Sequence, residues 1–218
     1  MKMFRKMLAL CLTICLCTVF GAMLFRIYIA EHYPEQTLRM VFSPSLMEYY
    51  YENAEDFSPK TQEIRFPYDS AEDGNFFAAG LIVVPEAGNL QVTVRYNESC
   101  LLRVAAFYKL PATPEPREGL FRYTLTASYN EAEEGNDFRT YEATVLREDS
   151  AFMYRYGKLV FDGVDFTGAA WMRVDIYYGE EAEPFGHICV YESRTFDGEN
   201  MLEVPLEDYK VDEEDLPK

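Results

Sequence analysis

The sequence predicts an all-β protein, in which an antiparallel β-sandwich or jelly-roll-like ectodomain stands behind one N-terminal transmembrane helix. Three observations predict this fold class. A run of nineteen residues without a charge, Met7 to Phe25, lies near the N-terminus. Segments with alternating apolar and polar side chains then follow one another between turn-like stretches. No convincing amphipathic helix separates these segments, as a parallel α/β fold would require.

The apolar run is long enough to cross a bilayer. Nineteen helical residues span about 28 Å, which matches the hydrocarbon core of a membrane. Lys2, Arg5 and Lys6 precede the run, so the positive-inside rule places the N-terminus in the cytoplasm and the rest of the chain outside it. We therefore expect a cytoplasmic basic N-terminus over residues 1–6 and a transmembrane signal anchor over residues 7–30.

A cleaved signal peptide is the alternative, because signal anchors and signal peptides both have a basic start followed by an apolar run. Cleavage would leave a secreted protein. The run exceeds the usual signal-peptide core of about 7 to 15 residues, and no A-x-A triplet follows it. We therefore favour a protein of the cell membrane that keeps its anchor.

The remaining chain fits one domain, which we place at residues 36–205, followed by an acidic disordered tail over residues 206–218.

Beyond residue 30, 16 basic and 37 acidic residues give a formal net charge of −21. Such a charge repels nucleic acids and anionic lipid surfaces, so no nucleic-acid partner is predicted, whereas basic partners are compatible with it.

Strands are predicted where β-branched and aromatic residues alternate with polar ones. Leu90 to Tyr96 is expected to be half-buried, because its apolar residues alternate with Gln91, Thr93 and Arg95. Residues 45–55 predict a short helix that Ser43 or Ser45 would cap. The other predicted strands are 38–42, 62–68, 76–84, 100–110, 120–129, 138–147, 151–161, 171–178, 186–191 and 201–204.

Two cysteines, Cys100 and Cys189, lie outside the apolar run. An exported location permits a disulfide between them. Two separately buried thiols are the alternative, because both cysteines lie in strand-like stretches.

Catalysis is poorly supported by the sequence. His187 and Cys189 share one face of a predicted strand, but residues two apart lie roughly 6 to 7 Å from each other, too far for direct activation of the thiol. The chain has no G-x-S-x-G, H-E-x-x-H or P-loop motif. The acidic turn from Asp69 to Asn75 lacks the ligand spacing of an EF-hand. No catalytic residue, cofactor or metal site is therefore predicted.

Aromatic residues offer the most specific binding hypothesis. The chain has 17 Tyr and 16 Phe, and Trp171, Arg173, Asp175 and Tyr177 share one face of a predicted strand. Such a face can stack on a sugar ring and bond its hydroxyls. The alternative is that both faces of the strand are partly buried and Trp171 belongs to the core.

The leading functional hypothesis is a single-pass, non-catalytic binding or assembly module that meets a protein partner at the cell surface. The alternative is an exported carbohydrate-binding or carbohydrate-processing protein. An assembly module needs an apolar patch or a free sheet edge, whereas a sugar binder needs exposed aromatic rings.

Overall fold

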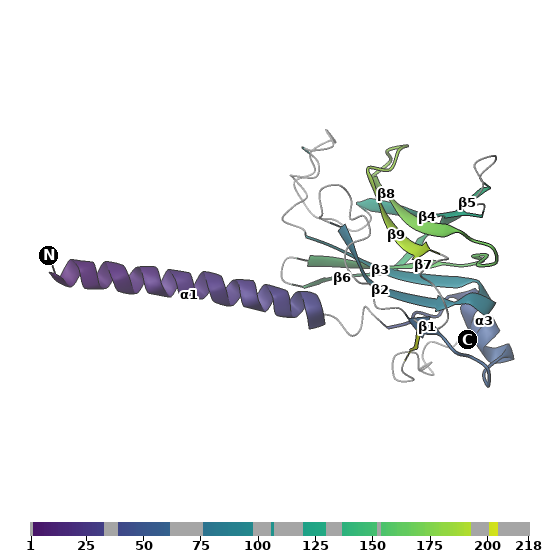
Figure 1. The fold of residues 1–218 in the computed structure, drawn as a ribbon, viewed down its shortest axis with the longest axis horizontal. Helices are drawn as coiled ribbons and strands as arrows, with labels where there is room; N and C mark the ends of the chain where they lie inside the picture. The colour runs from purple at the N-terminus through teal and green to yellow at the C-terminus, as the bar shows by residue number, and fades with distance from the viewer. Residues whose placement is uncertain are drawn as a thin grey trace.

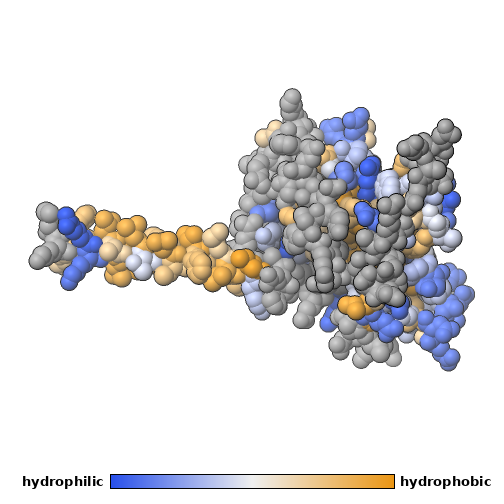
Figure 2. Space-filling model, viewed as in Figure 1, coloured by the Kyte–Doolittle hydropathy of each residue, from blue (hydrophilic) through white to orange (hydrophobic). Residues whose placement is uncertain are grey.

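The computed structural model describes residues 2–32, 39–61, 76–97, 106, 120–129, 137–151, 154–192 and 201–204. One long helix, α1 (Lys2–His32), projects away from a domain made of two β-sheets (Figure 1). Its segment Met3–Phe25 is long and apolar enough to cross a membrane, and none of this segment is buried inside the protein. Figure 2 shows hydrophobic residues along most of its length, as a lipid-facing helix requires.

The domain is a sandwich of two antiparallel sheets, which confirms the predicted fold class. The six-stranded sheet has the strand order β10-β1-β2-β3-β7-β6, and the four-stranded sheet has the order β5-β4-β8-β9. The strands are β1 (Lys60–Thr61), β2 (Phe76–Val84), β3 (Asn89–Asn97), β4 (Phe121–Ser128), β5 (Phe138–Glu142), β6 (Thr144–Ala151), β7 (Tyr154–Phe161), β8 (Trp171–Tyr178), β9 (Gly186–Glu192) and β10 (Leu202–Glu203), with a 3-10 turn, η1 (Pro85–Ala87), between β2 and β3.

The main core lies between the two sheets, where the central strands contribute alternate residues. Aromatic rings pack closely within it: the ring centroid of Phe76 lies 4.8 Å from that of Phe121, edge to face, and 5.1 Å from that of Tyr96, on which it stacks. From β8, the core receives the set that the alternation predicts, namely Met172, Val174, Ile176 and Tyr178.

A second, smaller core covers the outer face of the six-stranded sheet, where α3 (Pro44–Glu52) packs (Figure 1). Ser43 caps this helix, because its Oγ accepts a hydrogen bond of 3.3 Å from the Leu46 N–H. The predicted helix and its cap are therefore present, although the helix ends at Glu52 rather than at residue 55. Buried apolar side chains hold the two elements together: Met40, Leu46, Phe57, Ile82, Val84 and Val204.

The outer face of β3 is buried, so the prediction of a half-buried strand is wrong. Gln91 is 0% exposed. Its Nε2 donates to the Val41 carbonyl at 2.7 Å, and its Oε1 accepts from the Val41 N–H at 2.9 Å. The predicted strand over 38–42 is wrong for its described part, because residues 39–42 form no strand. The chain is instead bonded to the sheet at Val41 by Gln91 and at Ser43 by Asp162. The polar half of the β3 alternation marks a covered, hydrogen-bonded face rather than a solvated one.

The predicted strand 138–147 is two strands in different sheets. β5 pairs with β4, whereas β6 pairs with β7. The chain changes sheet at Ala143, whose N–H still donates to the Tyr123 carbonyl at 3.3 Å. Both halves keep the alternation of a strand, so the pattern does not mark the crossing. The crossing makes β5 an edge of the four-stranded sheet.

Several predictions fall outside the described residues. These are the strand over 62–68, the acidic turn after it, the tail over 206–218 and, apart from Ala106, the strand over 100–110. Cys100 lies there as well, so its pairing with Cys189 stays a prediction.

Candidate binding face

The four predicted site residues lie on the outer face of the four-stranded sheet, opposite the core-facing residues of β8. Trp171, Arg173 and Tyr177 are half-buried, whereas Asp175 is only 3% exposed. Three of the four side chains are thus partly open to solvent, whereas Asp175 is buried.

Asp175 holds Arg173 in place. Its Oδ1 lies 2.9 Å from the Arg173 Nε, and its Oδ2 accepts a hydrogen bond of 2.6 Å from the Thr126 hydroxyl on β4. The contact between Nε and Oδ1 is an ion pair without hydrogen-bond alignment. Because a buried carboxylate balances the guanidinium, this part of the face has no net charge.

Two arginine–aromatic contacts fix the rings of this face. The guanidinium carbon of Arg173 lies 5.4 Å from the Trp171 ring centroid, and that of Arg122 on β4 lies 4.1 Å from the Tyr177 ring centroid. Arg122 also donates to the Glu181 carbonyl at 3.3 Å, and the Thr124 hydroxyl donates to the Tyr177 hydroxyl at 3.5 Å. One face of the Tyr177 ring is therefore already occupied by Arg122.

Phe138 extends the face across the sheet from the edge strand β5. Ser128 of β4 is paired with Phe138 on one side and with Trp171 on the other. The two rings have centroids 5.9 Å apart and cover Ser128, which is 1% exposed and whose Oγ lacks a hydrogen-bond partner. Phe138 itself is 51% exposed. The small side chain of Ser128 lets the two large rings approach each other.

We call these five side chains, Phe138, Trp171, Arg173, Tyr177 and Arg122, the aromatic–arginine layer. Phe138 and Arg122 are not among the predicted site residues, because they come from β5 and β4 and only the strand register places them beside β8. Their alternation within their own strands was visible, but it carries no information on which strands are neighbours. His187 and Cys189 of β9 are paired with Asp175 and Arg173 at the border of this face.

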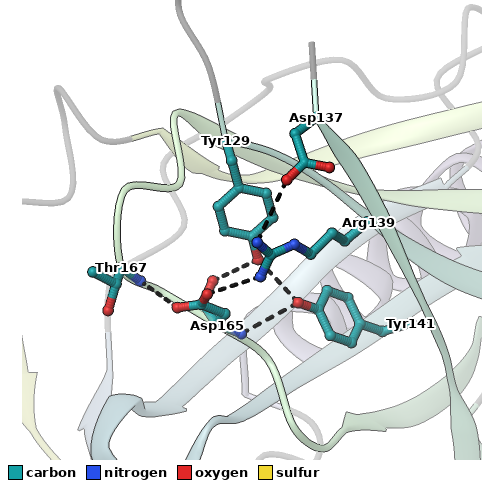
Figure 3. Close-up of polar contacts among 6 residues, drawn as sticks. All are labelled: Tyr129, Asp137, Arg139, Tyr141, Asp165 and Thr167. Carbon is teal, nitrogen blue, oxygen red and sulfur yellow. Dashed lines mark hydrogen bonds and ion pairs between the residues drawn. The ribbon is translucent and has the colours of Figure 1, made fainter. Parts of the chain in front are cut away.

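A second polar cluster ties β5 to the β7–β8 connection (Figure 3). Arg139 donates to Asp165 at 2.9 Å, lies 3.4 Å from Asp137 and has its guanidinium carbon 4.2 Å from the Tyr129 ring centroid. Tyr129 donates to the Asp165 carbonyl at 2.6 Å, and its oxygen lies 2.9 Å from the Tyr141 hydroxyl oxygen. We call the set Tyr129, Asp137, Arg139, Tyr141, Asp165 and Thr167 the Arg139 cluster.

Two side chains of the Arg139 cluster have pKa values shifted by their neighbours. The Thr167 N–H, which donates at 2.9 Å, and the Arg139 guanidinium lower the pKa of the Asp165 carboxyl. Burial and the hydrogen bond with Tyr141 raise the pKa of the Tyr129 hydroxyl well above its ordinary value. The contacts that shift these pKa values also join β5 to the β7–β8 connection.

One lysine is buried on the outer face of the six-stranded sheet. Lys158 of β7 is 1% exposed, and its Nζ lies 3.4 Å from the Thr93 hydroxyl on β3, to which it donates. Burial lowers the pKa of this ammonium group from 10.5 to about 7. Nothing in the sequence distinguishes Lys158, because a lysine within a predicted strand ordinarily faces solvent.

Among known proteins, no family, no curated sequence and no solved structure matches this chain.

Proposed function

We propose that this chain is a single-pass membrane protein that displays its β-sandwich outside the cytoplasm as a non-catalytic binding or assembly module. The unburied apolar segment Met3–Phe25 supports the anchor. Lys2, Arg5 and Lys6 before it support a cytoplasmic N-terminus, because cationic residues flank the cytoplasmic end of such helices. The alternative is cleavage of this segment and secretion of the domain.

The aromatic–arginine layer is the observation that carries the binding role. Trp, Tyr and Arg are the residue types that dominate the energetic centres of protein interfaces. Here Arg173 is already paired with Asp175, and Tyr177 is already contacted by Thr124 and Arg122, so a partner would have fewer side chains to order on binding. The net charge of −21 on the exported part, from 16 basic and 37 acidic residues, favours a basic protein partner.

Carbohydrate binding is a second candidate, which the exposed Phe138 and the half-buried Trp171 support. Their rings and the Arg173 guanidinium combine an apolar platform with hydrogen-bond donors, as sugar sites do. Tyr177 contributes less to this platform than the sequence analysis expects, because Arg122 lies over its ring.

Site-specific photocrosslinking in the native membrane tests the protein-binding role. A benzophenone amino acid at position 138 should give a discrete crosslinked protein, whereas the same group at position 51 should not. Tyr51 is a matched control because it is also exposed, at 54%, but lies on α3. Trp171→Ala should weaken the adduct from position 138. The same adduct from both positions, or none from position 138, would contradict the proposal.

Tryptophan fluorescence tests the carbohydrate candidate, because Trp171 is the only tryptophan of the chain. A neutral polysaccharide that binds the layer should change the emission of Trp171, and Phe138→Ala should reduce this change in emission.

Tags at both ends of the chain test the anchor. A polypeptide that keeps both tags and exposes only the C-terminal tag to external protease has the proposed topology. Loss of the N-terminal tag would instead support cleavage and secretion.

A further inference from the structure

We infer that the outer edge of β5, to which no described strand pairs, binds an extended, net basic segment of another protein as an added strand. The inference rests on the proposed binding function and names how the partner is recognised. It concerns the backbone of Phe138, Thr140 and Glu142, which lies beside the aromatic–arginine layer.

The hydrogen-bond register of β4 and β5 identifies the outward-facing groups. The Tyr129 N–H donates to the Asp137 carbonyl at 3.1 Å, and the Ala143 N–H donates to the Tyr123 carbonyl at 3.3 Å. In an antiparallel pair, hydrogen-bonded positions alternate with non-bonded ones. Between these two ends, Arg139 and Tyr141 therefore bond to β4.

The backbone N–H and C=O groups of Phe138, Thr140 and Glu142 consequently point away from β4. β5 is the last strand of its sheet, and within the described part of the chain no strand pairs with this side of it. Four of its five residues are exposed, and Tyr141 is half-buried. Three residues thus present donors and acceptors at the spacing that an incoming strand requires.

β5 is also the most regular of the four sheet edges formed by the described strands. The pairing of β6 shifts register between Val145 and Arg147, and that of β9 shifts opposite Met172 and Arg173. β10 has only two residues. The β4–β5 pairing has no such shift, and β5 has no proline. Bulges, proline and short length are the usual protections of an edge, and β5 has only its charged residues.

The Arg139 cluster holds this edge in place before any partner arrives. The 2.9 Å bond from Arg139 to Asp165 and the 2.9 Å contact between the Tyr129 and Tyr141 hydroxyls join β5 to β4 and to the β7–β8 connection. An ordered edge avoids part of the conformational entropy that strand addition otherwise costs.

Charge indicates the chemistry of the partner. Glu142 is exposed at one end of the edge, and the part of the chain beyond residue 30 carries 37 acidic against 16 basic residues. A second copy would bring the same excess of negative charge to the edge, so the occupant is a basic segment of a different protein. An apolar side chain next to Phe138 would complete the contact, because that ring is 51% exposed.

The probe is an unbiased library of twelve-residue peptides displayed on phage and selected against the full chain in nanodiscs. In the enriched peptides, Lys and Arg should be frequent and should alternate along the chain with β-branched or aromatic residues. A bound peptide should slow deuterium exchange at the amides of Phe138, Thr140 and Glu142. Protection that falls elsewhere, or a selection that enriches no basic pattern, would overturn the inference.

Thr140→Pro is the decisive variant, because it removes an outward N–H and leaves the bonds to β4 intact. It should weaken peptide binding roughly tenfold, since one net hydrogen bond is worth about that factor. Glu183→Pro is the matched control, because Glu183 is exposed in the β8–β9 connection. Equal affinity for both proline variants would refute strand addition. If Thr140→Pro does not fold, Glu142→Lys replaces it and should weaken binding several-fold.

The two proposals fail separately. A native protein that crosslinks at position 138 but binds Thr140→Pro normally would leave the binding module standing and refute the added strand. Peptides that protect the β5 amides, without any native adduct, would support the edge and refute the protein-binding role of the layer.

Discussion

Lys158 offers the sharpest test of how this domain is packed. Its ammonium group loses a proton far more readily in the folded protein, since burial lowers its pKa from 10.5 to about 7. Between these two values the unfolded chain binds more protons than the folded one, so the free energy of unfolding rises with pH. The penalty is largest below pH 7 and vanishes above the pKa of the unfolded chain.

The magnitude follows from the size of the pKa shift. A group whose pKa falls from 10.5 to about 7 contributes a rise of about 2 kcal/mol in the free energy of unfolding between pH 7 and pH 9. Lys158→Met removes this titration and keeps a side chain of similar length. At pH 7 the variant should therefore be the more stable protein, by up to about 4 kcal/mol.

Urea denaturation of the fragment from residue 33 onward, followed by Trp171 fluorescence, measures both proteins at pH 7, 8 and 9. The difference between wild type and Lys158→Met isolates this lysine from the tyrosines that titrate at higher pH. Lys60→Met is the control, because the Lys60 side chain is 34% exposed. Wild-type and Lys158→Met curves that stay parallel over this pH range would refute the buried, neutral amine.

Three further predictions concern hydrogen bonds. Gln91→Leu should lower the free energy of unfolding by about 2 to 3 kcal/mol, because it leaves the N–H and C=O groups of Val41 without their partner. Urea denaturation measures this loss, and an unchanged urea midpoint would contradict a stabilising role of the two hydrogen bonds. Ser128→Ala should leave the thermal midpoint unchanged or slightly raised, since the buried Oγ has no hydrogen-bond partner; a fall of several degrees would indicate that the hydroxyl is bonded. The pKa of Asp165 lies below its unfolded value of 3.8, so its stabilisation is present at neutral pH and is lost as pH falls through the folded value. Asp165→Asn should therefore lower the thermal midpoint at pH 7 and flatten the acid profile, and parallel acid profiles of the two proteins would argue against that role.

The sequence predicts the strands better than their neighbours. The predicted strand 171–178 has the same bounds as β8, because its alternation of apolar and polar side chains is strict and its inner face is the core. The position of Phe138 beside Trp171 was not foreseen, because that proximity depends on β4 lying between the two strands. Periodicity is a property of one segment, whereas a surface is assembled from several.

Burial depth was the other failure. Gln91 and Lys158 have the polarity of solvated residues, and alternation alone assigns them to a wet face. Both are buried on the outer side of the six-stranded sheet. Over part of that side α3 and residues 39–43 add a third layer, in which Val41 bonds to Gln91. The sequence predicts the capped helix after Ser43 that belongs to this layer, but it does not indicate on which sheet the helix packs.

The hydrogen bonds between Gln91 and Val41 also limit the distance between the end of α1 and the β-sandwich. α1 ends at His32, and the chain is fastened to the sheet from Met40 and Val41 onward. Eight residue steps cover at most about 28 Å even when fully extended. In the proposed topology the sandwich therefore works within a thin shell above the bilayer, and only partners that come down to that height, or share the same membrane, come within its reach.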